Sequence, residues 1–269
     1  MDLTPRNYHS REANREYMSA SQYKRWLECP AATHASLQPG AKAEKPRPGM
    51  AEGSYGHAIM EGTDHLWVMA HPDVSTGGGK NLRASFKTVA AAAELLLEQP
   101  WLEETMGRQR QAEEIITFVL GGAAWKAMLD LIVVTPGHEA IVDFKFMRSL
   151  DKGEWMNMAG DDEPPRWAKV SWWEYYDYYR QLAIYRHGHG EVYRSEPDCY
   201  IAAASKEDPP DVEIYHLADH ARMDAEIELV QKNLPAILEM KAGPPANLVR
   251  CERCAYCRPT KRITHPVTI

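Results

Sequence analysis

Residues 124–146 form two apolar runs around a Pro-Gly turn, and this stretch constrains the fold more than any other part of the chain. Pro136 and Gly137 suit the centre of a type II turn, because proline fixes φ and glycine accepts a positive φ. The flanking runs are rich in β-branched residues, so we predict an antiparallel hairpin. A turn centred there places Asp130 directly opposite Asp143.

The predicted register brings two carboxylates and an ammonium group to one face of the hairpin. The Cβ atoms of Asp130 and Asp143 would be about 5 Å apart. Lys145 follows Asp143 by two residues and shares its face. Two facing carboxylates between apolar strands repel each other, and a divalent cation would relieve that repulsion. Alternatively the register slips, one carboxylate lies at the surface, and Lys145 only neutralises the other.

Length and charge limit the classes of protein to consider. The 269 residues are enough for one large domain, or one domain with appendages. A net charge of −7 argues against a protein that coats nucleic acid non-specifically, although an enzyme with a local basic groove stays open. The first residues lack the apolar core of a signal peptide, and no apolar run approaches the roughly 18 residues of a membrane span. We therefore expect a cytoplasmic protein.

The first half of the chain reads as helical. Ser19 and Gln22 form a predicted capping box, with Gln22 returning the bond of the Ser19 cap, and the helix that they open ends before Cys29-Pro30. Residues 38–53 are predicted to be a connector, and residues 56–70 a second helix with His57 and Glu61 on one face. Taken alone, His57 is an ordinary polar residue near a helix start.

The other predicted elements are a helix at 85–99, a strand at 113–120, a long loop at 150–171, a helix at 172–187, strands at 198–204 and 212–217, and a helix at 219–241. A loop of that length is often a lid or contacts substrate. Gln181 and Tyr185 share a face of the helix at 172–187, whose dense aromatic residues suit a core or base stacking. Pro235 should kink or divide the last helix.

Four of the five cysteines are candidate metal ligands, because a reducing compartment favours metal binding over disulfides. Cys251, Cys254 and Cys257 have the compact spacing that holds an iron–sulfur cluster, for which Cys29 is the natural fourth ligand. Zinc is the closest alternative to the cluster. Either metal would pin the C-terminal segment onto the N-terminal one. Cys199 lies within a predicted strand and reads as a small buried hydrophobe.

Five ordered motifs resemble the PD-(D/E)xK nuclease superfamily, in the branch of RecB-type nuclease domains and phage RecE-like exonucleases. They are Ser19-x-Ser21 with Cys29-Pro30, Gly53-x-x-Gly56-His57, Asp130, Asp143-x-Lys145 and Gln181-x-x-x-Tyr185. Together they span nearly the whole chain. One departure is Leu129, which replaces the proline of the superfamily's name and leaves the chemistry intact, since only the carboxylate binds metal.

The resemblance implies an α/β (α+β) fold with a restriction-endonuclease-like core, in which a central mixed sheet is flanked by helices. Its core would be residues 56–217, preceded by a helical segment and connector at 1–55 and followed by a segment at 218–269 that packs back on the N-terminal one. It also implies metal and DNA ligands. Mg²⁺ or Mn²⁺ would be bound by His57, Asp130, Asp143 and the carbonyl of Phe144, with Lys145 acting on the attacking water and Gln181 and Tyr185 holding the DNA strand.

The implied function is a metal-dependent DNA exonuclease, phage or prophage encoded, that resects linear single- or double-stranded ends for recombination and repair with a strand-annealing protein. The resemblance also makes a homo-oligomer plausible. Cysteines split between the two ends of the chain are similar to those of iron–sulfur nucleases such as AddB-type enzymes and the CRISPR-associated spacer-capture nuclease, and so predict a [4Fe-4S] cluster. Two alternatives stay open: CRISPR spacer processing, and a non-catalytic subunit that binds DNA ends.

Overall fold

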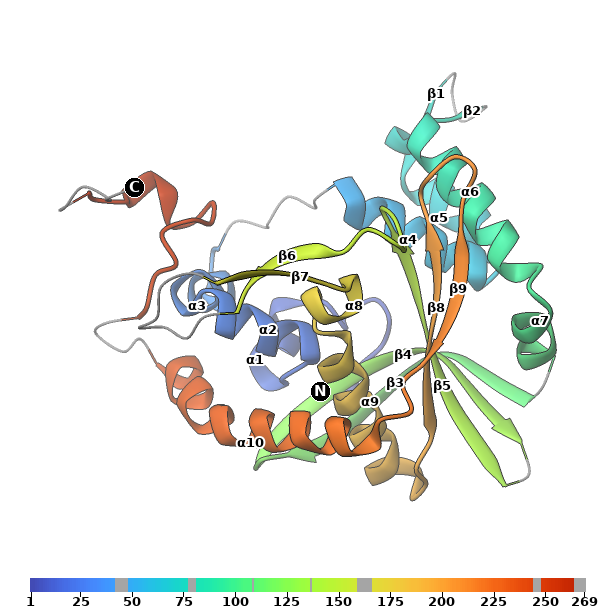
Figure 1. Cartoon of the computed structure of the whole chain (residues 1–269). Coiled ribbons are helices and arrows are strands. Elements are labelled where there is room, and N and C mark those ends of the chain that lie inside the picture. The colour runs from blue at the N-terminus through green and yellow to red at the C-terminus, as the bar shows by residue number, and fades with distance from the viewer. Residues whose placement is uncertain are drawn as a thin grey trace.

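A five-stranded mixed sheet forms the centre of the computed structural model, which describes residues 1–41, 48–76, 81–107, 109–135, 137–158, 166–243 and 248–263 (Figure 1). Its strand order is β3-β4-β5-β8-β9, and β5 and β8 are the one parallel pair among these strands. The strands are β3 (Gln109–Leu120), β4 (Ala123–Thr135), β5 (His138–Met147), β8 (Asp198–Ser205) and β9 (Val212–His216). The prediction of a central mixed sheet flanked by helices is confirmed.

The β4–β5 hairpin has the predicted register. Leu131 pairs with Val142 and Thr135 with His138, as a turn centred on residues 136 and 137 requires. Gly137 has a φ of 81°, the left-handed conformation for which glycine was expected. Pro136 lies outside the described residues. The sequence around the turn therefore set the register of the whole pair.

Helices cover both faces of the sheet, and each face has its own core. On one side α4 (Pro48–Met60) and α6 (Ala84–Leu97) pack over a cluster that includes Val142. On the other side α9 (Tyr178–Tyr193) and α10 (His220–Ala242) pack over a cluster that includes Ile141. The central strands are apolar on both faces, which explains their continuous apolar runs.

Two predicted segments of the N-terminal half are divided differently in the structure. The helix predicted at 56–70 is two helices, α4 and α5 (Asp64–Ala70), which are separated by a turn at Gly62 with a φ of 73°. The connector predicted at 38–53 was placed too far along the chain, because α4 already begins at Pro48. Residues 42–47 of that connector lie outside the described part. Smaller elements here are α7 (Pro100–Met106), η1 (Pro72–Val74), β1 (Ser75–Thr76) and β2 (Asn81–Leu82).

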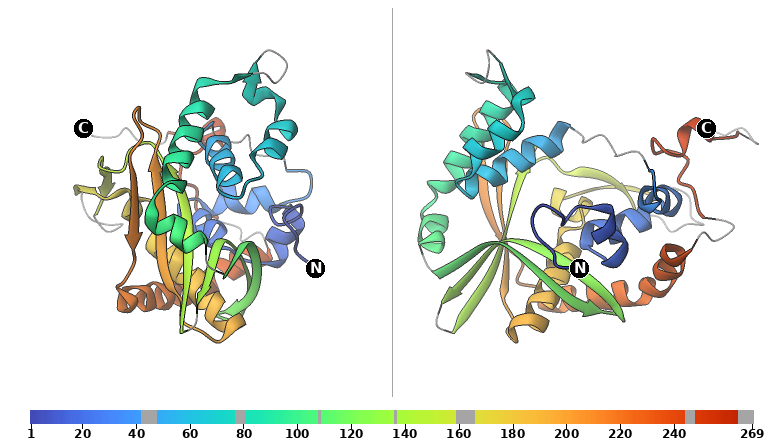
Figure 2. Two further views of the ribbon diagram at one scale, coloured as in Figure 1. Left: turned by 90° about the vertical axis from the view of Figure 1, so that its right-hand side faces the viewer. Right: turned by 180° about the vertical axis from the view of Figure 1, so that it is seen from behind.

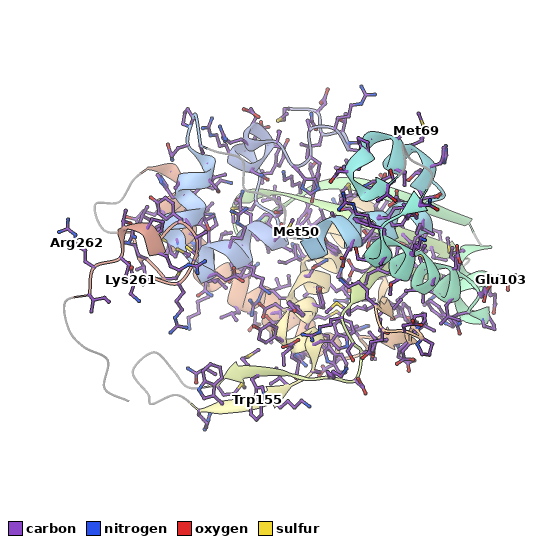
Figure 3. All side chains as sticks on the ribbon, turned by 90° about the horizontal axis from the view of Figure 1, so that it is seen from above. Met50, Met69, Glu103, Trp155, Lys261 and Arg262 are labelled. Carbon is purple, nitrogen blue, oxygen red and sulfur yellow. The ribbon has the colours of Figure 1, made fainter. Side chains whose placement is uncertain are left out.

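The segment predicted as a long loop contains an antiparallel hairpin, β6 (Glu154–Asn157) with β7 (Trp167–Val170). The hairpin runs along the rim of the molecule, and Trp155 stands at its outer edge with 63% of its surface exposed (Figure 3). The acidic run at 161–163 lies outside the described residues. The alternation of exposed and half-buried side chains in each strand is too short to be recognised among the irregular residues around it.

The helix predicted at 172–187 is also interrupted. It consists of α8 (Trp172–Tyr175) and α9, and Asp177 between them has a left-handed backbone with a φ of 58°. By contrast, α10 is continuous through Pro235, so of the two predicted effects of this proline, a kink or a division, the division does not occur. None of the described helices is both long and apolar enough to cross a membrane.

The N-terminal helices α1 (Arg11–Glu16), α2 (Ala20–Glu28) and α3 (Pro30–Leu37) lie against the C-terminal part of the chain. Ser19 caps α2 by accepting a 3.2 Å hydrogen bond from Gln22 N, as predicted. The Gln22 side chain does not return this bond. It donates to the carbonyl of Asn14 and accepts from Lys241 on α10, so it joins the two ends of the chain.

Candidate functional site

The sheet forks at Asp130 and Asp143. Pairing between β4 and β5 ends at Leu131 and Val142, and beyond this point β5 continues along β8 (Figure 1, Figure 2). The other neighbour of β4 is β3. In β3, Glu113 lies opposite Asp130, between two residues that pair with β4, and it has a φ of 51°. A left-handed residue within a strand interrupts its ladder. The backbone around Asp130 is therefore freed from regular pairing.

Side chains fill the fork. Asp130 Oδ2 accepts a 2.8 Å hydrogen bond from the backbone N–H of Phe144, which replaces a strand-to-strand bond. Lys145 Nζ forms an ion pair with Asp143 Oδ2 and donates a 3.3 Å hydrogen bond to the carbonyl of Phe144. Asp143 is 3% exposed and Lys145 is 14% exposed. The predicted trio of Asp130, Asp143 and Lys145 therefore meets at one place, in a partly desolvated setting.

The surroundings push the pKa values of the two carboxyl groups in opposite directions. Burial raises the pKa of Asp143; the Lys145 ammonium offsets part of this effect, and the nearby Asp130 carboxylate adds to it. Burial alone would raise the pKa of Asp130, but His57 and Lys145 outweigh it, so that this pKa is lowered. Two buried carboxylates side by side are kept ionised only by nearby positive charge. The two carboxylates at the fork therefore favour positive charge beside them.

His57 reaches the site from α4, on the face of the sheet that α4 and α6 cover. Its Nδ1 lies 3.4 Å from Asp130 Oδ1, and its ring packs edge-on to Phe144 and Phe146. Burial would lower the pKa of His57, but Asp130 reverses the direction and raises it. The glycine before it, Gly56, allows α4 to approach, because a Cβ there would come within 2.4 Å of the Phe146 ring.

Gly56→Ala is therefore expected to lower the free energy of unfolding by about 1–3 kcal/mol through overpacking, and to move His57 away from Asp130. Gly53 in the same helix provides the control, since nothing lies within 4 Å of a Cβ at that position. Gly53→Ala should raise stability by up to about 1 kcal/mol through helix propensity. Urea denaturation of both variants checks this pair, and equal shifts would contradict the packing argument.

Helix α9 supplies three polar side chains. Gln181 Nε2 donates to Asp143 Oδ1 at 3.0 Å and to the hydroxyl of Tyr185 at 3.2 Å, so both predicted residues face the site. The Lys145 ammonium lies 5.0 Å from the centre of the Tyr178 ring, a cation–π contact. Burial raises the pKa of Tyr178 to about 12, so its hydroxyl is protonated at neutral pH.

Some neighbours of the site carry little signal in the sequence. The left-handed conformation of Glu113 could not be foreseen, because glutamate rarely adopts it. Glu61 follows α4, and burial together with the charge of Glu113 raises its pKa to about 7. Its spacing of four residues from His57 was the one available hint. The contact of Tyr178 with Lys145 could be anticipated only from its position one turn before Gln181.

The four predicted cysteines come together at the other end of the molecule. Cys29 lies between α2 and α3, with its Sγ 3.6 Å from that of Cys257 and 3.9 Å from that of Cys254. The four sulfur atoms, including Cys251, all lie within 4.8 Å of one another. Cys199 lies apart in the buried strand β8, and burial raises the pKa of its thiol to about 12, as expected of a residue in the core.

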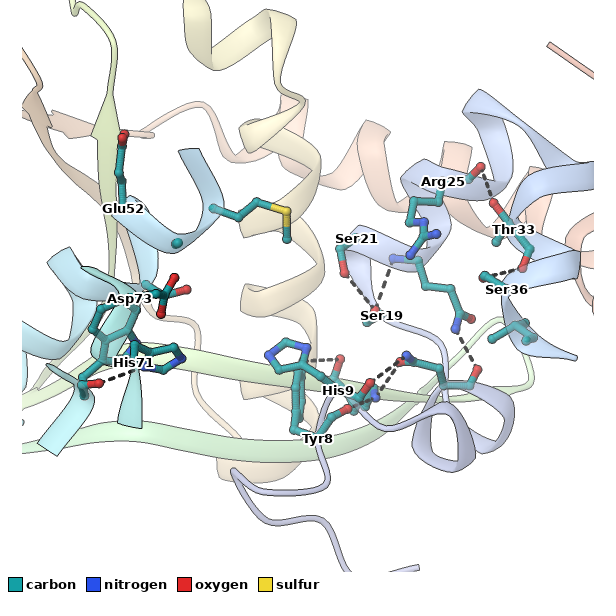
Figure 4. Close-up of a pocket in the computed structure, with 18 of the residues that line it drawn as sticks. Tyr8, His9, Ser19, Ser21, Arg25, Thr33, Ser36, Glu52, His71 and Asp73 are labelled. Carbon is teal, nitrogen blue, oxygen red and sulfur yellow. Dashed lines mark hydrogen bonds between the residues drawn. The ribbon is translucent and has the colours of Figure 1, made fainter. Parts of the chain in front are cut away.

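Pockets adjoin the fork. An open pocket of about 1080 Å³ lies between the N-terminal helices and α4–α6 and is lined by polar side chains such as Ser19, Ser21 and Arg25 (Figure 4). It does not contain the carboxylates themselves. A smaller pocket of about 190 Å³ is lined by Tyr178 and Gln181, which contact the site directly. Ser21, near the start of α2, lines both pockets.

Comparison with known proteins agrees with this geometry. A family model described as a PDDEXK-like domain of unknown function (DUF3799) matches residues 19–260. The crystal structure of a candidate exonuclease from Eubacterium rectale is similar, with a TM-score of 0.85 and 29% identity over 100% of this chain and 97% of that one. The alignment with the structure of SSO0001 covers 84% of this chain and 88% of that one at 12% identity. Its TM-score of 0.27 is too low to indicate a shared fold. No curated protein sequence matches.

Proposed function

The chain belongs to the PDDEXK-like domain family DUF3799, and from this premise we propose that it is a divalent-metal-dependent deoxyribonuclease that degrades DNA from its ends. The observation that carries the proposal is the meeting of Asp130, Asp143 and Lys145 at the fork of the sheet, with His57 beside them. The similarity to a candidate exonuclease supports it further.

The donor set fits Mg²⁺ or Mn²⁺. Carboxylate and carbonyl oxygens with one imidazole are hard ligands that suit these ions. The Lys145 ammonium lies against Asp143 Oδ2 and the Phe144 carbonyl, so these two oxygens already accept a cation. The ligand atoms are more widely spaced than those of the cysteine group, and metal binding would draw them together. The proposed ligands are His57, Asp130, Asp143 and the Phe144 carbonyl.

A bound divalent cation would polarise the scissile phosphate and lower the pKa of an attacking water. Lys145 carries a fixed positive charge in a desolvated position, where it stabilises negative charge that develops on the phosphate. Gln181 holds the Asp143 carboxylate in place, and Tyr185 in turn accepts a hydrogen bond from Gln181. These residues therefore position the ligands rather than take part in proton transfer.

We also propose that the four cysteines bind a metal. Four thiolates around one Zn²⁺, with bonds of about 2.3 Å, form a tetrahedron with edges of about 3.8 Å. The Sγ separations of 3.6 Å (Cys29 to Cys257) and 3.9 Å (Cys29 to Cys254) match these edges. In a [4Fe-4S] cluster each thiolate would bind a different iron atom, so the four sulfur atoms would lie farther apart than around one zinc ion. The spacing of the sulfur atoms thus favours zinc, whereas the spacing in the sequence favours the [4Fe-4S] cluster.

Resection of DNA ends for recombination with an annealing protein is the biological role that the sequence resemblance implies. The alternative of a non-catalytic subunit that binds DNA ends is less favoured, because such a subunit has no need for Lys145 buried against Asp143. The ion pair of these two residues costs desolvation, and catalysis gives a reason to keep it.

Digestion of DNA tests the proposal. We expect a linear duplex to be degraded in Mg²⁺ or Mn²⁺ but not in EDTA, and a covalently closed circle to be resistant. Asp143→Asn, which preserves the shape of the side chain, should abolish degradation while the circular dichroism spectrum stays that of the wild type. Survival of the linear duplex in both metals would contradict the enzyme proposal. Equal cutting of the circle would contradict degradation from the ends.

A further inference from the structure

Three pockets that share lining residues lie beside the proposed catalytic site. The inner pocket of about 190 Å³ at Gln181 shares Lys24, Tyr176 and Asp177 with an outer pocket of about 520 Å³. It shares Ser21 with the large pocket. The inner and outer pockets, here called the groove, lie between α2 and the α8–α9 junction, and Gln181 connects them to Asp143.

Aromatic rings line this groove from the catalytic lysine outwards. The Tyr178 ring lies over Lys145, Tyr176 follows with its ring centre 5.9 Å from that of Tyr178, and Tyr175 lies 5.0 Å farther on. Tyr175 is 39% exposed and Tyr176 is 37% exposed. The left-handed backbone of Asp177 separates α8 from α9 just beyond these two residues.

The charged side chains of the inner pocket are paired. Lys24 and Arg180 each lie 3.6 Å from the Asp177 carboxylate, and Arg180 also pairs with Glu226 at 2.8 Å. Lys24 also donates a 3.1 Å hydrogen bond to the Tyr176 carbonyl and lies 5.6 Å from the centre of the Tyr176 ring. Two carboxylates thus balance the two cations, so a ligand here would be held by the aromatic rings rather than by net charge.

We propose that this groove binds single-stranded DNA, whose bases stack on Tyr176 and Tyr175 while its backbone leads to the catalytic site. Sequence-tolerant stacking on aromatic side chains is how single strands are held without base readout. Only unpaired bases are free to stack on such rings, so a duplex end would have to fray before its strand binds here. This inference rests on the proposed nuclease function and adds to it the form of the substrate.

Binding without cleavage tests the groove. Fluorescence anisotropy of a labelled oligo(dT) in EDTA should show that Tyr176→Ala weakens binding by roughly five- to hundredfold, the range for loss of one stacked base. Tyr176→Phe keeps the ring and should restore binding. Tyr193→Ala is the matched control, because Tyr193 is equally exposed at 37% but lies at the far end of α9. It should bind as the wild type does.

A second measurement uses cleavage by the wild type and by Tyr176→Ala. The variant should raise KM for a duplex with a single-stranded overhang and leave kcat within about twofold. The inference is overturned if Tyr176→Ala binds oligo(dT) like the wild type, if Tyr193→Ala weakens binding equally, or if duplex DNA with cross-linked blunt ends binds as tightly as oligo(dT). Failure of the nuclease proposal is recognised separately, as the absence of metal-dependent cleavage by the wild type.

Discussion

Lys145→Met is expected to slow DNA cleavage by about 10²- to 10³-fold, the usual cost of removing one group that stabilises charge in a transition state. The lysine is the one cation within 4.0 Å of Asp143 among the described residues. Methionine preserves the length and apolar stem of the side chain, so the loss reports on the ammonium group. Lys152→Met is the control, since Lys152 is exposed and pairs with Glu207 at the surface.

Lys145→Met should also lower the free energy of unfolding. Without Lys145, Asp143 becomes a buried carboxylate with no partner cation, at a cost of about 3–5 kcal/mol in the free energy of unfolding. Mg²⁺ would supply the missing charge, so we expect a larger increase in melting temperature on adding Mg²⁺ to the variant than to the wild type. Equal Mg²⁺ shifts would show that the ion does not bind at Asp143, and wild-type turnover would remove Lys145 from the catalytic group.

Cys254→Ser is expected to lower the free energy of unfolding by at least about 3 kcal/mol. Mutation of a group that only hydrogen-bonds a metal ligand can lower metal affinity by about a hundredfold. Loss of a ligand itself should cost at least as much, and the lost binding energy lowers the stability of the folded state. For a chain of this size that corresponds to a fall of roughly 6–12 °C in melting temperature. The residue acts at long range, because the cysteine group joins Cys29 between α2 and α3 to the C-terminal segment.

Metal analysis distinguishes the occupants of the cysteine group. We expect about one zinc per chain in the wild type, no visible absorption, and loss of the zinc in Cys254→Ser. Cys199→Ala is the control, because Cys199 lies outside the group and its loss should leave the metal content unchanged. A brown anaerobic protein with iron and sulfide would contradict zinc, and a wild type with no metal would contradict the whole centre.

The parts of the fold that followed from the sequence are those fixed by local rules. The predicted turn gave the register that the structure has, in which Leu131 pairs with Val142 and Thr135 with His138, and this register places Asp143 and Lys145 on one face. Helix spacing placed Gln181 and Tyr185 together. In each case a single turn or a single helical repeat determines the geometry, because the spacing of the residues in the sequence then sets their relative positions in space.

The parts that did not follow depend on contacts between distant segments or on unusual backbone. The break at Asp177 needs a left-handed aspartate, and the fork needs a left-handed Glu113. Aspartate adopts this conformation more often than most residues but is usually not left-handed, and glutamate rarely adopts it. The large pocket is assembled from α2, α3, α4 and α6, so no single stretch encodes it. Pro235 lies within the continuous helix α10, although local propensity alone allowed this proline to divide the helix.

The fork of the sheet makes part of the site independent of side-chain identity. Because β4 and β5 separate at Asp130, the N–H of Phe144 is available to that carboxylate and its C=O to Lys145. Both groups belong to the main chain, which every residue except proline carries in full. An alanine scan would therefore miss the proposed role of the Phe144 carbonyl as a metal ligand and would report Phe144 only as a packing residue. Substitutions at this position would suggest that the residue is dispensable, while the proposed main-chain ligand would be retained.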